Sequence, residues 1–273
     1  MPVQVSAEVR GPVSYREFAP SPDLAHVVLS YWEFAVADDT KEPFTHQVFA
    51  DGCVSLAYHR NIKKGVSRLH VVGPRLDSFR VEVGGGDNFW GARFSPAACS
   101  LVLGFNPATL QNQILDFPQP APAAWKKLLR QLSRSDSFGE AVAAYGSFLR
   151  SLGLKPTDVD QGVATAVRLI EASQGRARVA EVAAEVGLSV RQLERRFRAA
   201  AGLTPKQFAR IRRVRATAVT LVKDKAKDWA ARATEMGFAD QSHLAREIAA
   251  VTGRSPVPFA EDVAEIEHGN LVE

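Results

Sequence analysis

The residues best suited to chemistry lie together in one short basic segment. It contains five polar side chains at close spacing: Arg191, Gln192, Glu194, Arg195 and Arg198. Arg191 and Arg195 are four residues apart, so they share one face if the segment is helical. Arginine donates two hydrogen bonds to guanine O6 and N7, glutamine suits adenine or a phosphate, and glutamate accepts from cytosine or holds an arginine. The segment is therefore predicted to read base edges, although a basic helix face is more commonly only solvated.

The surrounding sequence predicts two short helices that would position these side chains. Apolar residues recur at helical spacing before Gly187 and again after Ser189, where Leu193, Phe197 and Ala200 form the inner face. Gly187 suits the positive φ at the end of a helix, and Ser189 can cap the next one. The pattern predicts a helix-turn-helix over residues 179–200, with the basic helix entering a major groove.

The same pattern occurs again over residues 228–250. A helix is predicted to end at Gly237, and Asp240 is predicted to cap another helix with four candidate DNA contacts: Gln241, Ser242, His243 and Arg246. Between the units, Thr204 and Pro205 begin a helix that should reach about Val222 and span about 28 Å. Successive major grooves on one side of DNA lie about 34 Å apart, so one chain could occupy two of them. Arg213 on this helix is a candidate phosphate contact.

The placement of charge supports a polyanionic partner. Residues 161–254 hold 18 Lys and Arg against 9 Asp and Glu, a net charge of +9, whereas the whole 273-residue chain carries only +4. Residues 261–273 form an acidic tail. The two cysteines, Cys53 and Cys99, the lack of a signal-peptide pattern and the lack of a membrane-spanning stretch predict a cytoplasmic protein without membrane attachment.

The first part of the chain predicts a different fold. Short β-branched and aromatic segments separated by Gly, Pro and Asp turns indicate an antiparallel β barrel or sandwich, and helices follow from about residue 96. The predicted class is α+β with two domains. Residues 1–157 would sense an effector or mediate dimerisation, and residues 158–260 would form an all-α domain with tandem helix-turn-helix units. The helix predicted at 138–152 could be a dimer contact or could pack on its own barrel.

Candidate effector residues in the first domain are Trp32, Cys53, Trp90 and Arg93, with the arginine recognising an acidic small molecule. Aromatic residues on strands are more often ordinary core, and Cys53 is more often a small buried residue than a sensor. His46, His59 and His70 raise an alternative, a metal-dependent cupin-like enzyme carrying a DNA-binding module. They lack the tight ligand cluster of such enzymes, so no catalytic residue, metal or cofactor is predicted.

The two units resemble the AraC/XylS family of bacterial transcription regulators over roughly residues 160–260. The similarity rests on GLSVRQLERRFRAAAGLTPKQFARIRRVRATAVTLV and on MGFADQSHLAREIAAVTGRSP. The first part of the chain resembles a sensor-type domain that precedes such modules. This resemblance rests on the segments YREFAPSP, SYWEF, DGCVSL, VVGPR and ARFSPAA. The resemblance implies a transcription regulator, not an enzyme, that binds double-stranded DNA and contacts RNA polymerase if it is an activator. It also implies an unidentified small-molecule effector and allows a homodimer.

Overall fold

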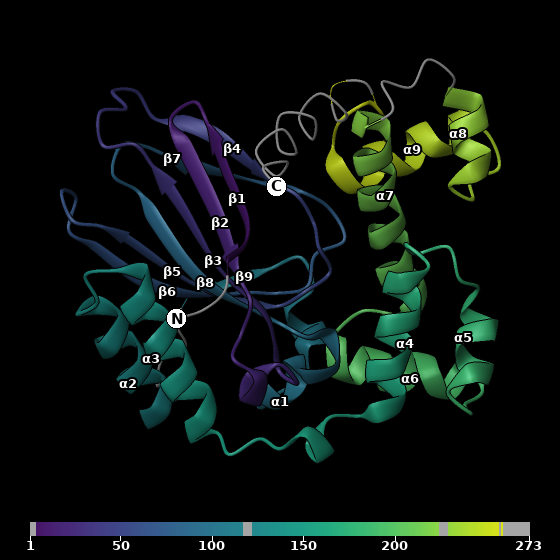
Figure 1. The fold of residues 1–273 in the computed structure, drawn as a ribbon, viewed down its shortest axis with the longest axis horizontal. Coiled ribbons are helices and arrows are strands. Elements are labelled where there is room, and N and C mark those ends of the chain that lie inside the picture. Colours follow the sequence, from purple (N-terminus) through teal and green to yellow (C-terminus); the bar gives the residue numbers. More distant parts are fainter. Residues whose placement is uncertain (1–3, 117–121, 224–228, 257, 259–273) are drawn as a thin grey trace.

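The computed structural model describes residues 4–116, 122–223, 229–256 and 258 (Figure 1). A β-rich part and an all-helical part lie side by side, and the long helix α7(Pro205–Lys223) runs through the helical part. The predicted α+β class is therefore confirmed. The predicted acidic tail at 261–273 lies outside the described residues.

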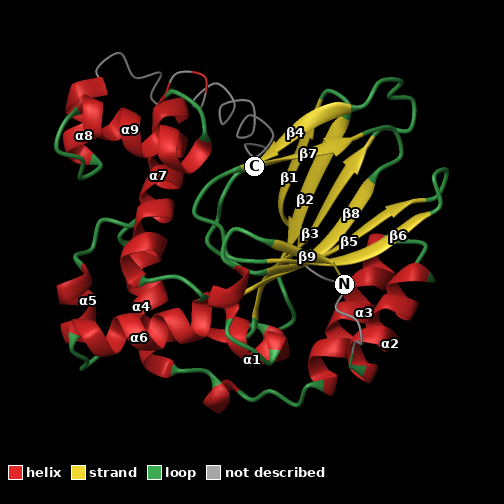
Figure 2. Cartoon of the chain, turned by 180° about the vertical axis from the view of Figure 1, so that it is seen from behind, coloured by secondary structure: helices red, strands yellow, loops and turns green. Residues whose placement is uncertain are grey.

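Two antiparallel sheets make up the β-rich part. The larger has the order β1-β2-β3-β8-β5-β6-β9, and the smaller pairs β4 with β7. The strands are β1(Gln4–Arg10), β2(Val13–Phe18), β3(Val28–Val36), β4(Phe44–Val48), β5(Ser55–Asn61), β6(Val66–Val72), β7(Phe79–Val83), β8(Asn88–Phe94) and β9(Ile114–Asp116). β1 and β9 are edge strands, so the architecture is an open sandwich and not a closed barrel (Figure 2).

The two faces of the larger sheet pack against different elements, because successive side chains of a strand point to opposite sides. One face, which includes Tyr31 and Trp90, belongs to the main core with α2(Ala123–Ser133) and α3(Phe138–Ser151). The Tyr145 hydroxyl of α3 donates to the carbonyl of Trp90 at 2.8 Å. The buried side of α3 therefore packs on its own sheet, which is the second of the two predicted roles of this helix. Phe34 on the other face clusters with Val83 of the small sheet.

The helical part has one pair of helices at each position where a helix-turn-helix unit was predicted. α4(Gln161–Ala172) precedes the first unit, α5(Val179–Glu185) and α6(Val190–Ala201); α7 leads to the second, α8(Trp229–Glu235) and α9(Gln241–Thr252). The Ser189 side chain accepts from Gln192 N, and the Asp240 side chain accepts from His243 N, so both predicted N-caps are confirmed. α6 and α9 each end at a left-handed glycine, Gly202 and Gly253.

Short elements after β8 join the two parts into one core. These are η2(Pro96–Ala98), α1(Cys99–Leu103) and η3(Pro107–Leu110), and α6 packs on all three. Leu193 and Phe197 of α6 belong to the same buried cluster as Ala97 and Ala98. At Gly202 a Cβ would come within 2.8 Å of the Pro107 carbonyl carbon and 2.9 Å of Ala108 N, so the close approach requires glycine. Two further 3₁₀ turns are η1(Pro22–Leu24), between β2 and β3, and η4(Pro156–Asp158), between α3 and α4.

Three strands were not predicted from the sequence. β1 and β2 precede the first predicted strand, and β9 follows the first helices. Helices were expected from about residue 96 onward, but the helical turn that begins at Pro107 ends at Leu110 and the chain continues into β9, which pairs with β6. The pairing partner of β9 lies far away in sequence, so no local pattern marks it.

Candidate nucleic-acid interface and effector cavity

The outer face of α6 presents its charged residues to solvent. Arg191, Glu194, Arg195 and Arg198 are exposed, whereas Leu193 and Phe197 are completely buried. The helix thus has one face committed to the core and one basic face available to a partner.

Gln192 has a structural task at the start of α6. Its side-chain oxygen accepts from Ser189 N at 2.9 Å, and its own N–H donates to Ser189 Oγ at 3.3 Å. This reciprocal pair satisfies backbone groups that the first turn leaves without helical partners. The expected contact of Gln192 with adenine would compete with this cap.

Arg196 points away from the exposed face and pairs with α4. Its Nε and Nη2 donate to the two carboxylate oxygens of Asp160 at 2.7 and 2.6 Å. Burial alone would raise the pKa of Asp160, but the hydrogen bonds from Arg196 and from the backbone N–H of Val163 hold it below its ordinary value. Arg196 therefore ties α6 to the start of α4 and is not part of the exposed face.

The second unit presents a smaller polar face. Gln241, Ser242 and Arg246 on α9 are exposed, while the His243 side chain is part-buried. His243 Nδ1 accepts from Ala239 N at 3.2 Å, and the ring packs edge-on against Phe238 at 5.6 Å. His243 and Gln192 both occupy the third position of their helices, and both side chains bond to the chain just before the helix.

Aligning the two helices by position separates shared from different residues. Arg195 and Arg246 both stand at the sixth position, whereas the first position holds Val190 in α6 and Gln241 in α9. Val190 is 40% exposed although it is apolar. The predicted cap at Ser189 already places Val190 at the first position of the helix, but only polar side chains were expected to contact DNA, so Val190 was missed.

Arg213 lies between α7 and the second unit. Its Nη1 donates to the Gly237 carbonyl at 3.2 Å, and its guanidinium lies 4.6 Å from the centre of the Phe238 ring. Burial lowers its pKa below the ordinary value for arginine. The side chain is thus engaged inside the protein in the place where a phosphate contact was expected.

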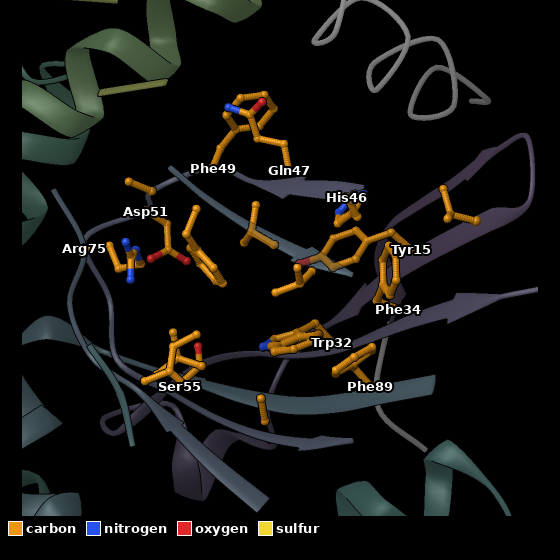
Figure 3. A pocket seen from close by; sticks show the side chains of 18 of the residues that line it. Tyr15, Trp32, Phe34, His46, Gln47, Phe49, Asp51, Ser55, Arg75 and Phe89 are labelled. Carbon is orange, nitrogen blue, oxygen red and sulfur yellow. The ribbon is translucent and has the colours of Figure 1, made fainter. Parts of the chain in front are cut away.

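A cavity of about 1150 Å³ lies between the two sheets of the sandwich (Figure 3). Aromatic and aliphatic side chains from both sheets form most of its wall, and Gln47, Arg215 and Arg254 also line it. The cavity therefore reaches from the strands to residues of the helical part.

Three of the four candidate effector residues line this cavity. Trp32, Cys53 and Arg93 border it, but Trp90 does not. Trp90 and Arg93 are three positions apart on β8, so they must lie on opposite faces of the sheet. Trp90 is buried on the face toward α3, and its Nε1 donates to Glu33 at 3.0 Å.

Arg93 is already engaged by two carboxylates. Its Nη1 donates to Glu17 at 2.5 Å, and its Nε lies 2.6 Å from Asp51 Oδ2. Burial alone would lower the pKa of Arg93, but Tyr15, Asp51 and Glu17 hold it well above its ordinary value. Burial likewise would raise the pKa of Glu17, yet Arg93 keeps it below the usual value. Both partners stay charged. Arg93 therefore has no unpaired positive charge to offer to an acidic effector.

The cysteine and histidine candidates have ordinary surroundings. Burial raises the pKa of the Cys53 thiol, and of Cys99 to about 12, so both remain protonated thiols. His59 bonds to Asp87 at 3.0 Å, and His70 pairs with Asp116 at 2.8 Å. Among the described residues no group of three His, Cys, Asp or Glu is arranged to hold a metal ion.

The small sheet also contacts the second helix-turn-helix unit. The Thr252 carbonyl at the end of α9 accepts from Gln47 Nε2, and from Ser78 Oγ at 2.5 Å. Arg254 Nε donates to Gln47 Oε1 at 3.0 Å, and Ser78 N donates to the Val251 carbonyl at 2.8 Å. We call this set of bonds the Gln47–Thr252 contact. Gln47 belongs both to it and to the cavity wall.

Two family models match separate parts of the chain. Residues 182–261 match a family described as a helix-turn-helix domain, and residues 16–116 match a domain of unknown function, DUF6597. No curated protein shows significant sequence similarity. No described helix is long and apolar enough to span a membrane.

Several solved structures share a coarse likeness, among them structures of ToxT from Vibrio cholerae. The 1.65 Å structure has 11% identity and a TM-score of 0.40, and the match covers 82% of this chain and 98% of that one. ToxT bound to an unsaturated fatty acid has 12% identity and a TM-score of 0.39, covering 86% of this chain and 94% of that one. The resemblance to AraC/XylS regulators is confirmed over residues 182–261, the part of the chain that matches a helix-turn-helix domain.

Proposed function

We propose that the chain is a sequence-specific DNA-binding transcription regulator whose two helix-turn-helix units occupy adjacent major grooves. The observation that carries this proposal is the pair of capped helices, α6 and α9, with exposed polar faces on either side of α7. The 19 residues of α7 span about 28 Å, which suits the roughly 34 Å between successive grooves.

The exposed residues of the two helices receive different roles. Arg191 and Arg195 read guanine, and Arg198 and Glu194 complete the first face. Gln241, Ser242 and Arg246 form the second face. Gln192, His243 and Arg213 instead hold the helices in place, because each already bonds to neighbouring backbone.

The sandwich controls these units through a small-molecule effector in its cavity. Gln47 supports this part of the proposal, because it lines the cavity and also bonds to the Thr252 carbonyl at the end of α9. A ligand that moves β4 would change how α9 is held. Binding would shift the population of DNA-competent arrangements by the ligand's difference in affinity for them.

Selection from random-sequence duplex DNA with the full chain tests the proposal. We expect one enriched asymmetric operator, and Arg195→Ala should weaken binding to it by about 1–3 kcal/mol and relax the preference at one base pair. Arg130→Ala is the matched control, because Arg130 is an exposed arginine on α2. Failure to enrich any sequence, or equal losses for the two variants, would count against sequence reading by α6.

A further inference from the structure

Tyr, Trp and Phe side chains gather on the larger-sheet side of the cavity wall. Tyr15 of β2 stacks near Trp32 of β3 with ring centres 6.4 Å apart, and Phe34 of β3 meets Phe89 of β8 edge-on at 5.9 Å. Phe44 and Phe79 line the cavity from the small sheet. Aromatic walls on both sides suit a flat ring system, because stacked and edge-on contacts add to simple burial of area.

Trp32 lies flat against the larger sheet, which forms one wall of the cavity. It faces Gly91 of β8, where a Cβ would overlap the indole ring, so the glycine is required for this placement. The indole Nε1 is buried and has no hydrogen-bond partner in the part of the chain that the structure describes. Figure 3 shows the nitrogen edge of the indole pointing into the cavity on the side away from Phe89. Buried donors are nearly always paired, so this one calls for an acceptor on a ligand.

Charged groups near the larger sheet pair with one another, whereas two arginines towards the helical part bond to neutral oxygens. Glu17 and Asp51 both engage Arg93, and Arg75 pairs with Asp77 at 3.3 Å while lying over the Phe79 ring. Towards the helical part, Arg254 donates to Gln47 at 3.0 Å and Arg215 to the Ala50 carbonyl at 3.4 Å. A charged ligand entering between the sheets would lose its hydration, and near the larger sheet it would find Glu17, Asp51 and Arg93 already engaged with one another.

We propose that the cavity takes an uncharged aromatic ligand that accepts a hydrogen bond from Trp32 Nε1. The aromatic walls supply the affinity, and the indole N–H fixes the orientation of the ligand. This inference rests on the proposed function only in taking the cavity as the effector site. It replaces the acidic effector that Arg93 suggested from the sequence.

Four small probes separate the possible ligand classes in calorimetric titrations of the full chain. Quinoline has an acceptor nitrogen, naphthalene has the same shape without it, 2-naphthoate adds a carboxylate, and decanoate is an acid without a ring. We expect quinoline to bind most tightly and naphthalene more weakly by about fivefold, the size of one hydrogen bond. The two acids should bind more weakly than both.

The variant Trp32→Phe removes the N–H and keeps an aromatic side chain. It should reduce quinoline affinity by about fivefold and leave naphthalene affinity nearly unchanged. Trp90→Phe is the matched control, because Trp90 lies on the opposite face of the same sheet and should leave both affinities unchanged. The melting temperature of each variant checks that the fold is retained.

Three outcomes would overturn the inference. Tighter binding of 2-naphthoate or decanoate that is lost in Arg215→Gln would identify an acidic ligand instead. If Trp32→Phe lowered the affinities for quinoline and naphthalene equally, the indole N–H would not donate a hydrogen bond to the ligand. No binding of any probe would reject an aromatic ligand, and the operator selection with the full chain would still decide separately whether the protein reads DNA.

Discussion

At the scale of single residues, the two recognition helices are unequal. α6 presents Val190, Arg191, Glu194, Arg195 and Arg198, whereas the matching positions of α9 hold Gln241, Ser242, Ala245, Arg246 and Ala249. Only the arginine at the sixth position is common to both. The two half-sites of an operator should therefore differ in sequence, and the chain should bind in one orientation.

Val190 is expected to contact a thymine methyl group. Residues at the start of a recognition helix meet base edges, and apolar side chains suit the methyl group of thymine. Replacing the contacted thymine with uracil should weaken binding about fourfold, the value of roughly one buried methylene-sized group. Val190→Ala should remove this difference between thymine and uracil, measured by fluorescence anisotropy.

Ile62→Ala provides the control for that experiment. Ile62 is the most exposed large apolar residue described, at 78%, and belongs to the turn between β5 and β6. Its variant should keep the full thymine preference. If Val190→Ala keeps it too, Val190 does not read the methyl group.

Arg213 should contribute to stability more than to DNA affinity. Arg213→Ala removes the bond to the Gly237 carbonyl and the contact with Phe238, so unfolding free energy should fall by about 1–2 kcal/mol. The salt dependence of DNA binding should stay as in the unaltered chain, because no phosphate contact is lost. Denaturant unfolding and salt titrations measure the two effects, with the exposed Arg168→Ala as control. A shallower dependence of DNA binding on salt in Arg213→Ala would show that Arg213 does contact a phosphate.

At the scale of elements, local chemistry made most helices predictable. Ser189, Asp240 and the glycines at 202 and 253 mark the ends of α6 and α9, and all four act through bonds or conformations within a few residues. Trp90 and Arg93 were expected in one site, but they lie on opposite faces of β8. Their spacing of three residues already indicates opposite faces of a strand. The cavity itself depends on the separation of two sheets, which no local pattern encodes.

The Gln47–Thr252 contact is a second element-scale feature with a measurable effect. Gln47→Ala removes bonds to Thr252, Ser78 and Arg254, so the end of α9 should open more often. Amide hydrogen exchange over residues 249–254 should accelerate roughly tenfold. Gln113→Ala, an exposed glutamine just before β9, should leave this exchange unchanged. Equal exchange in both variants would show that the contact does not hold α9.

At the scale of the whole molecule, the core crosses the predicted boundary near residue 158. Leu193, Phe197 and Ala200 of α6 share their buried cluster with Ala97, Ala98 and Val102. Residues 158–273 expressed alone would expose this surface to water. We expect the unfolding free energy of the fragment to be several kcal/mol lower than that of the full chain, because each such side chain gains roughly 1.5–3 kcal/mol from full burial. The melting temperature of the fragment should be lower as well.

Circular dichroism during heating tests this expectation, and operator binding by the fragment supplies a second readout. A fragment as stable as the full chain would show that the helical part folds independently. In that case the predicted boundary at 157/158 would be a true domain boundary, and the shared cluster would be only a docking surface.

The position of Gln47 has a consequence for how effector and operator influence one another. Because one side chain borders the cavity and bonds to the end of α9, displacement of α9 by DNA would also alter the cavity wall. Thermodynamic reciprocity requires the operator to change ligand affinity by the same factor by which the ligand changes operator affinity. The DNA-bound protein would then be a different receptor from the free one, so ligand screens on free protein would rank compounds for one of two states.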